Sequence, residues 1–239
     1  MILRTRLISS CYNNPIFFKG FSMPIRIFVM FFAASLLSQL LSAQWVELLN
    51  KKNLDGWESV GQGIWNVLRD GTLVGQRDLR EKANSDPNQA WLYTTRNFRE
   101  FDLEIEWWTR FGGNSGISIR DSSRARHTFG AEADPKRTPA RIGHEIQISN
   151  GYSDSYPTGS IYLFGKARPG VQIENDWNRF EITVRDSSIR VRLNGHVVAE
   201  HAGDPARVRS GPSGLQLHDP QSLVMFRNIR IREIPSSSR

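Results

Sequence analysis

From residue 44 onward, the chain carries short runs in which apolar and polar residues alternate. The clearest runs are 101–107, 117–120, 145–148, 180–185, 189–193, 215–218 and 228–231. Because successive side chains of an extended strand point to opposite faces, a two-residue repeat places all the apolar ones on one face. The pattern predicts a series of half-buried β-strands, and no segment after residue 44 has the period of an amphipathic helix.

Turn-forming residues lie between several of these runs. Asp70-Gly71 and Asn194-Gly195 are typical of hairpins in which both central residues need a positive φ. Residues 186–188 separate two alternating runs and predict a further hairpin. Strands with one apolar face need a second layer to cover it, so the sequence predicts an all-β fold, a two-sheet antiparallel β-sandwich.

Two segments between the predicted strands, 77–89 and 122–141, are long for connections in a compact domain. The second is rich in basic side chains: Arg124, Arg126, His127, Lys136, Arg137 and Arg141. Long loops in compact domains are often functional, but they can also be solvated excursions. Both interpretations of this segment stay open on the sequence alone.

The first 43 residues are typical of a targeting segment. A short basic start at Met23–Arg26 precedes an apolar stretch at 27–41, and Ala43 supplies a small residue for cleavage. We therefore predict a signal peptide over 1–43, with an upstream extension before Met23, although an uncleaved anchor is the alternative. The remainder predicts a single domain over 44–234, a tail over 235–239, and export to the periplasm or the extracellular space.

Removing this segment changes the charge. Arg4, Arg6, Lys19 and Arg26 leave with it and no acidic residue does, so the 31 basic residues fall by four to 27 against 24 acidic ones. A net charge of +3 instead of +7 gives no support to nucleic-acid binding, and we expect no membrane association after cleavage. Cys11 is lost too, so the mature chain has no disulfide and no thiolate site.

Polar faces of three predicted strands carry candidate chemistry. Ser118 and Arg120 share one face by alternation, as do Glu145 and Gln147, and Gln216 and His218. If the strands adjoin, they present a carboxylate, an imidazole, a guanidinium and amides together. Such a set can bind several hydroxyl groups and transfer a proton.

Short motifs in a fixed order resemble the 3-keto-disaccharide hydrolase family over nearly all of Trp45 to Glu233. They include Leu54-Asp55-Gly56-Trp57, Trp91-Leu92-Tyr93-Thr94, Gly113-Asn114-Ser115-Gly116-Ile117, His144-Glu145-Ile146-Gln147-Ile148, Thr158-Gly159-Ser160-Ile161-Tyr162 and Gly214-Leu215-Gln216-Leu217-His218. The resemblance implies a concanavalin-like jelly roll, usually exported from bacteria, that cleaves glycosides already oxidised to a ketone at C3. Two features depart from the family and leave the choice of substrate open. His144 stands where an aromatic or other residue is common, and the 122–141 loop varies in length in the family.

The strand that begins at Glu145 also resembles the Glu-x-Asp-x-x-Glu strand of jelly-roll endoglucanases. Gln147 and Asn150 replace the second and third carboxylates here. Ordinary retaining glycosidases need two carboxyl groups, so this strand argues against ordinary glycoside hydrolysis.

A 3-keto-glycoside needs less, because the ketone acidifies the proton on C2 and a single base can remove it. We expect Glu145 and His218 as the catalytic residues. The oxyanion candidates are Arg120, Gln147 and Asn114, and Gln216 and Tyr162 complete the expected substrate-binding set. No cofactor is expected.

A metal site is not expected either, because no typical ligand spacing occurs. His144, Glu145 and His218 would form a ligand set only if the fold brought them together, and His144 alternates onto the opposite face from Glu145.

Two other function classes remain open. A non-catalytic, lectin-like carbohydrate-binding module would use amides and aromatic residues such as Tyr162 without a proton-transfer group. A structural domain of the cell envelope is the third possibility. The presence of Glu145 together with His218 favours the enzyme.

Overall fold

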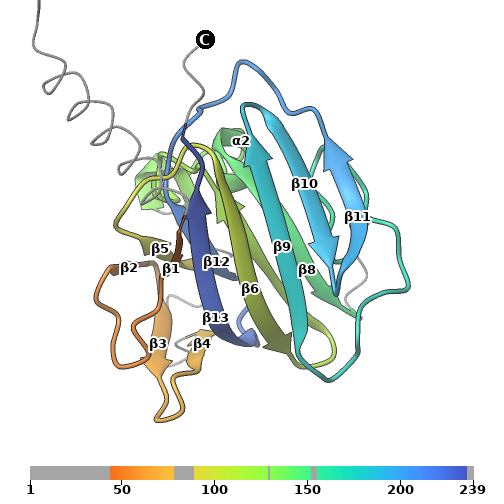
Figure 1. Cartoon of the computed structure of the whole chain (residues 1–239). Coiled ribbons are helices and arrows are strands. Elements are labelled where there is room, and N and C mark those ends of the chain that lie inside the picture. Colours follow the sequence, from red (N-terminus) through yellow and green to blue (C-terminus); the bar gives the residue numbers. More distant parts are fainter. Residues whose placement is uncertain (1–43, 78–88, 129, 152–154, 236–239) are drawn as a thin grey trace, which may run out of the picture. The chain divides into compact units, whose positions relative to one another are not determined.

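The computed structural model describes residues 44–77, 89–128, 130–151 and 155–235, and these form two antiparallel sheets (Figure 1). The predicted signal peptide, most of the 77–89 segment and the tail beyond residue 235 lie outside the described residues. Among those described, no helix has the length and apolar character needed to cross a bilayer.

The larger sheet has eight strands within the described residues, and it lies in front in Figure 1. Its strands are β1 (Trp45–Glu47), β3 (Gly63–Val67), β4 (Leu73–Arg77), β6 (Phe101–Thr109), β9 (Asn178–Arg185), β10 (Ser188–Leu193), β11 (His196–His201) and β13 (Leu223–Glu233). They are ordered β11-β10-β9-β6-β13-β4-β3, and β1 pairs with β13.

The smaller sheet has five strands among the residues described, in the order β2-β5-β12-β7-β8. These are β2 (Trp57–Val60), β5 (Ala90–Thr94), β7 (Gly113–Ile119), β8 (His144–Asn150) and β12 (Ser213–Leu217). The long β7–β8 connection carries two short 3-10 helices, η2 (Arg126–Thr128) and η3 (Gly130–Glu132), and the single-turn helix α2 (Pro139–Ile142). The predicted two-sheet antiparallel β-sandwich is confirmed.

The apolar side chains on the inner faces of the two sheets pack against one another and form one core. From the larger sheet it receives Leu103, Ile105, Trp107, Phe180, Ile182, Val184, Val191, Phe226 and Ile231, and from the smaller one Leu92, Ile117, Ile119, Ile146, Ile148, Leu215 and Leu217. All of these are nearly inaccessible to water. Burial of this apolar surface is the main stabilising term, since a chain with a single cysteine forms no internal disulfide.

Strand β13 departs from simple alternation at one point. Phe226 and Ile229 of β13 both face the core, which requires one extra residue between them, and Asn228 supplies it as a β-bulge with a φ of 50°.

At Asn194-Gly195 both residues have positive φ, 49° and 84°, as predicted. At Asp70-Gly71 the prediction is wrong for Asp70, whose carboxylate instead accepts a 2.9 Å hydrogen bond from the Thr72 amide.

A segment after β8 folds back along that strand. The Gln147 amide donates to the Ser160 carbonyl (2.9 Å), and the Gly159 amide donates to the Gln147 carbonyl (2.8 Å). The Tyr162 amide donates to the Glu145 carbonyl (2.8 Å). These bonds cover the edge of β8 and place Tyr162 beside Glu145.

Candidate functional site

The polar side chains of β12, β7 and β8 lie side by side on the outer face of the smaller sheet. Ser118 pairs with Glu145, and Gly116 pairs with Gln147. Unlike an ordinary solvated face, this one is buried, because Glu145 is only 6% exposed and Gln147 only 2%. Buried polar groups are costly unless they are hydrogen-bonded, which makes this face chemically unusual.

Glycines leave room for the large side chains of this face. A Cβ atom on Gly116 would lie 2.5 Å from Glu145 Oε1, so the carboxylate of Glu145 rests over Gly116. A Cβ atom on Gly214 would lie 2.4 Å from the ring of Tyr93. The glycines are therefore needed for close approach of neighbouring side chains, a constraint that a bare sequence pattern does not show.

A cavity of about 240 Å³ opens over this face. Its lining residues are Gln89, Asn114, Pro135, Thr138, Ala140, Arg141, Glu145, Gln147, Tyr162, Leu163 and His218. The structure thus brings together five of the seven predicted site residues: Asn114, Glu145, Gln147, Tyr162 and His218. They come from β7, β8, the segment after β8 and the end of β12.

An amide pair forms part of the floor of the cavity. Gln147 Nε2 donates to Asn114 Oδ1 at 3.0 Å. The backbone carbonyl of Asn114 accepts a bond of 3.1 Å from Ser222 Oγ. Both bonds use oxygen atoms of Asn114, so its side-chain nitrogen is not engaged by them and can donate to a ligand.

Gln216 lies on the same face but does not line the cavity. It is 1% exposed, and it pairs with Trp91 of β5. Within the described chain, neither Nε2 nor Oε1 of Gln216 has a hydrogen-bond partner, and the same holds for Trp91 Nε1. The predicted role of Gln216 in substrate binding stays a prediction.

Arg120 does not share this face, and the expectation from alternation is wrong. Strand β7 ends at Ile119, and Arg120 takes a φ of 58°, which redirects its side chain. Its guanidinium donates to the backbone carbonyls of Arg99 (2.8 Å) and Asp186 (2.6 Å). Burial, and then the nearby charge of Arg209, lower the pKa of Arg120 to about 10. It therefore anchors loops instead of facing a ligand.

Tyr93 and Asp121 are site neighbours that sequence reasoning missed. The Tyr93 hydroxyl donates to Asp121 Oδ2 at 2.6 Å, and the Ala125 amide donates to the same oxygen at 2.9 Å. Burial raises the pKa of Tyr93 well above its ordinary value, and the negative charges of Asp121 and Glu145 add to the effect. Tyr93 thus stays protonated and holds the start of the β7–β8 connection. The only sequence signal was that Trp91, Leu92 and Tyr93 break the alternation.

His144 lies on the opposite face of β8 from Glu145. Its ring lies 5.1 Å from that of Phe164. Burial lowers the pKa of His144 to about 4, with further contributions from the charges of Arg207 and Arg120. His144 therefore cannot join Glu145 and His218 as a ligand. In the part of the chain that the structure describes, no three His, Cys, Asp or Glu side chains gather into a possible metal site.

Comparison with solved structures finds similar sandwiches. A candidate glycosyl hydrolase from Parabacteroides distasonis ATCC 8503 is 25% identical, with a TM-score of 0.60 and coverage of 80% of this chain and 100% of that chain. A second candidate glycosyl hydrolase from the same organism is 20% identical, with a TM-score of 0.59 and coverage of 82% and 96%. A Bacillus subtilis protein of unknown function with a galectin-like fold is 12% identical, with a TM-score of 0.56 and coverage of 80% and 94%. These likenesses agree with the predicted concanavalin-like jelly roll.

The family of the chain follows from a direct match. A search of curated proteins finds no match. A family model for the 3-keto-alpha-glucoside-1,2-lyase-like domain matches residues 44–232, which confirms the resemblance to the 3-keto-disaccharide hydrolases. The protein is therefore carbohydrate-active, and the chain belongs to the family of 3-keto-alpha-glucoside-1,2-lyase-like domains.

Proposed function

We propose that the protein cleaves 3-keto-glycosides by removing the C2 proton and eliminating the C1 substituent. The observation that carries this proposal is the composition of the cavity. Among its described lining residues, Glu145 is the only carboxylate, and it stands with the amides of Asn114 and Gln147 and the imidazole of His218. One base with oxyanion donors suits elimination next to a ketone, whereas ordinary retaining hydrolysis needs two carboxyl groups.

The steps can be assigned to named atoms. A carboxylate oxygen of Glu145 takes the C2 proton, and the electron pair of that C–H bond moves toward the C3 carbonyl to give an enolate. Amide N–H groups of Asn114 and Gln147 stabilise the enolate oxygen, as in an oxyanion hole. The enolate then re-forms the ketone, creates the C1–C2 double bond and breaks the C1–O bond, while His218 gives a proton to the leaving oxygen. Addition of water across that double bond yields the free 3-keto-sugar.

The size of the cavity agrees with a small ligand. Pockets for drug-sized molecules commonly measure about 300–1,000 Å³. At about 240 Å³, this cavity suits one oxidised sugar ring with its leaving group near the opening. Tyr162 on the wall packs against Tyr156, with ring centroids 4.8 Å apart, and supplies an aromatic surface next to that opening.

Glu145→Gln tests the proposal, because it keeps the shape and hydrogen bonding of the side chain but removes the base. We expect turnover of a 3-keto-glucoside to fall by about a hundred- to ten-thousandfold. Glu132→Gln, on the exposed helix η3, is the matched control and should leave turnover unchanged. The unmodified protein should act poorly on the same glycoside without the ketone.

Three outcomes separate the alternatives. Equal activity on oxidised and ordinary glycosides contradicts the elimination mechanism. Full activity in Glu145→Gln transfers the role of the base to another group. Binding of both sugars with turnover of neither supports the lectin-like alternative.

We also propose that the protein is exported and cleaved after Ala43. The family match begins at residue 44, the position that follows the predicted cleavage point. Intact-mass measurement of protein recovered outside the cytoplasm should give a chain that begins near Gln44. A product that retains Met23 contradicts cleavage and supports an anchor.

A further inference from the structure

Arg141 is a cationic residue of the cavity wall that the proposed reaction does not use. It lines the same cavity as Glu145 and His218, and its side chain is exposed. It belongs to the single-turn helix α2, which lies directly before β8. Arg141 therefore borders the space that a substrate would fill.

Hydrogen bonds from Arg207 hold the backbone on either side of Arg141. Arg207 donates to the backbone carbonyl of Ala140 at 2.8 Å and also to that of Gly143. The guanidinium of Arg207 in turn lies 4.5 Å from the centre of the Phe164 ring. These contacts hold both ends of α2, so the position of Arg141 relative to the cavity is defined by packing.

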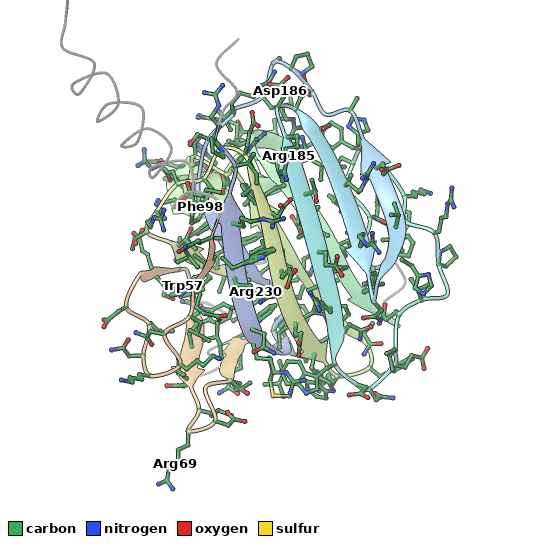
Figure 2. All side chains as sticks on the ribbon, viewed as in Figure 1. Trp57, Arg69, Phe98, Arg185, Asp186 and Arg230 are labelled. Atoms are coloured by element: carbon green, nitrogen blue, oxygen red, sulfur yellow. The ribbon has the colours of Figure 1, made fainter. Side chains whose placement is uncertain are left out.

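The charge of Arg141 has no acidic partner within the described residues. Arginines on the outer face of the larger sheet show the opposite behaviour, and Figure 2 labels Arg185 and Arg230 on that face. Their ion pairs are Arg179 and Arg230 with Glu104, Arg185 and Arg232 with Asp102, Arg190 with Glu200, Arg192 with Glu181, and Arg227 with Glu106. On this face of the larger sheet the arginines thus lie beside carboxylates, whereas Arg141 at the cavity makes no such pair among the described residues.

The surroundings of Arg141 add further positive charge. Burial is the main cause that lowers the pKa of Arg207, and the negative charge of Asp204 raises this pKa. The positive charge of Arg141 also lowers the pKa of Arg207, which indicates that the two cations are close enough to interact. Lys136 and Arg137, on the same connection, are exposed and likewise make no ion pair within the described part of the chain. Arg141 thus supplies positive charge on the wall of a cavity whose lining also holds the carboxylate of Glu145.

We propose that Arg141 makes the cavity specific for glycosides that carry an anionic group, a carboxylate or a sulfate. A guanidinium presents a planar fork of donors that matches such oxygen pairs, and the other side chains of its wall, Pro135, Thr138 and Ala140, are uncharged. The inference rests on the proposed function, because it names the class of substrate for that same reaction. The anion belongs either to the leaving group or to C6 of the oxidised sugar.

Kinetics on matched substrates test this specificity and distinguish the two sources. In the first pair the leaving group differs: one 3-keto-glucoside carries an anionic 4-carboxyphenyl group and the other a neutral 4-(hydroxymethyl)phenyl group. In the second pair the oxidised sugar differs: an anionic phenyl 3-keto-glucuronide is compared with the neutral phenyl 3-keto-glucoside. We expect the anionic member of one pair to be preferred by about ten- to a hundredfold in kcat/KM, mainly through KM, as for a charge-assisted hydrogen bond. Arg141→Gln should abolish this preference and change the neutral substrate less than about threefold.

Two variants control the interpretation. Arg141→Lys keeps the charge and should retain part of the preference. Arg137→Gln removes a neighbouring charge outside the cavity lining and should leave the preference nearly intact. An equal loss on neutral and anionic substrates in Arg141→Gln overturns the inference, because Arg141 would then act on the ketone oxygen itself.

Binding gives a readout that does not depend on turnover. Titration of Glu145→Gln protein with both pairs should show tighter binding of an anionic member, and Glu145→Gln/Arg141→Gln should remove the difference. If no substrate is turned over by the unmodified protein but this difference is found, the proposed reaction fails and the anion site stands. Turnover with no preference for either anionic substrate supports the reaction and overturns the anion site.

Discussion

The two sheets present polar outer faces of opposite character. On the larger sheet most outward side chains are charged and half-exposed, and many are joined in ion pairs such as Arg230 with Glu104 at 2.6 Å. On the smaller sheet the outward side chains of β7, β8 and β12 are amides, hydroxyls, glycines and one carboxylate, and every residue of these strands is buried. The same alternation of apolar and polar residues thus produces a solvated surface on one side and a cavity floor on the other.

Burial, and not polarity alone, therefore distinguishes the strand face that carries the candidate site. Exposed ion pairs contribute little to stability because water and salt screen them. Buried polar groups interact strongly with whatever charge develops near them, since the surrounding dielectric is low. Glu145 and Glu104 are both strand carboxylates, but Glu145 lies in a cavity floor and Glu104 sits between two arginines.

The largest stability effect should come from the core that the two faces share. Ile146→Ala in the smaller sheet and Ile182→Ala in the larger one should each reduce the free energy of unfolding by about 2–5 kcal/mol, because both side chains are nearly inaccessible. Urea denaturation checks this. A cost below about 1 kcal/mol for either variant contradicts a core built equally by both sheets.

Acid should destabilise the protein through His144. Its pKa of about 4 in the fold lies below the ordinary value of 6.5, so between these values the unfolded chain binds a proton that the folded chain does not. Stability is complete above pH 6.5 and falls as the pH drops toward 4, by up to about 3 kcal/mol.

His144→Phe should flatten this part of a stability-against-pH curve, measured by urea denaturation. Asp102→Asn is the control from the larger sheet. Burial raises the pKa of Asp102, but hydrogen bonds from Arg232 and Arg185 outweigh it, and the net pKa lies below the ordinary 3.8. Its stabilising contribution is present above 3.8 and is lost as the pH falls further, so Asp102→Asn should leave the slope between 4 and 6.5 unchanged.

Gly116→Ala should disturb the cavity without unfolding the sheet. The new Cβ would lie 2.5 Å from Glu145 Oε1, so the carboxylate must move. A displacement of about 1 Å at a catalytic group can cost about a hundredfold in rate. We expect such a loss in kcat for a 3-keto-glucoside. Gly165→Ala is the control, because its Cβ would meet only the Glu200 carbonyl at 3.8 Å. Equal kcat values for the two variants contradict the placement of Glu145.

The smallest effect should come from the charged face. Arg230→Ala removes ion pairing with Glu104, but both groups are partly exposed, and we expect a stability loss below about 1 kcal/mol. The loss should shrink further in high salt. Urea denaturation at low and high ionic strength measures it. A loss of several kcal/mol at both would show that this face stabilises the fold as strongly as the core does.

Much of the fold was predictable because strand alternation is a local property. The positions of Ile146, Leu215 and Ile231 toward the core follow from a two-residue repeat. The candidate site was predictable only in part. Glu145, Gln147 and His218 share a cavity as their alternation suggested, whereas Arg120 was misplaced because the regular backbone ends one residue earlier.

The class of fold, the polar side of most strand residues and the family can be inferred from the amino-acid sequence, because they depend on short-range periodicity and on ordered motifs. Which polar faces lie next to one another depends on the three-dimensional arrangement of the strands. The order β12-β7-β8 arises from pairings between strands far apart in the chain, and α2 brings Arg141 to the cavity from a long connection. Such pairings join segments that are distant along the chain, and no local pattern encodes which strands pair.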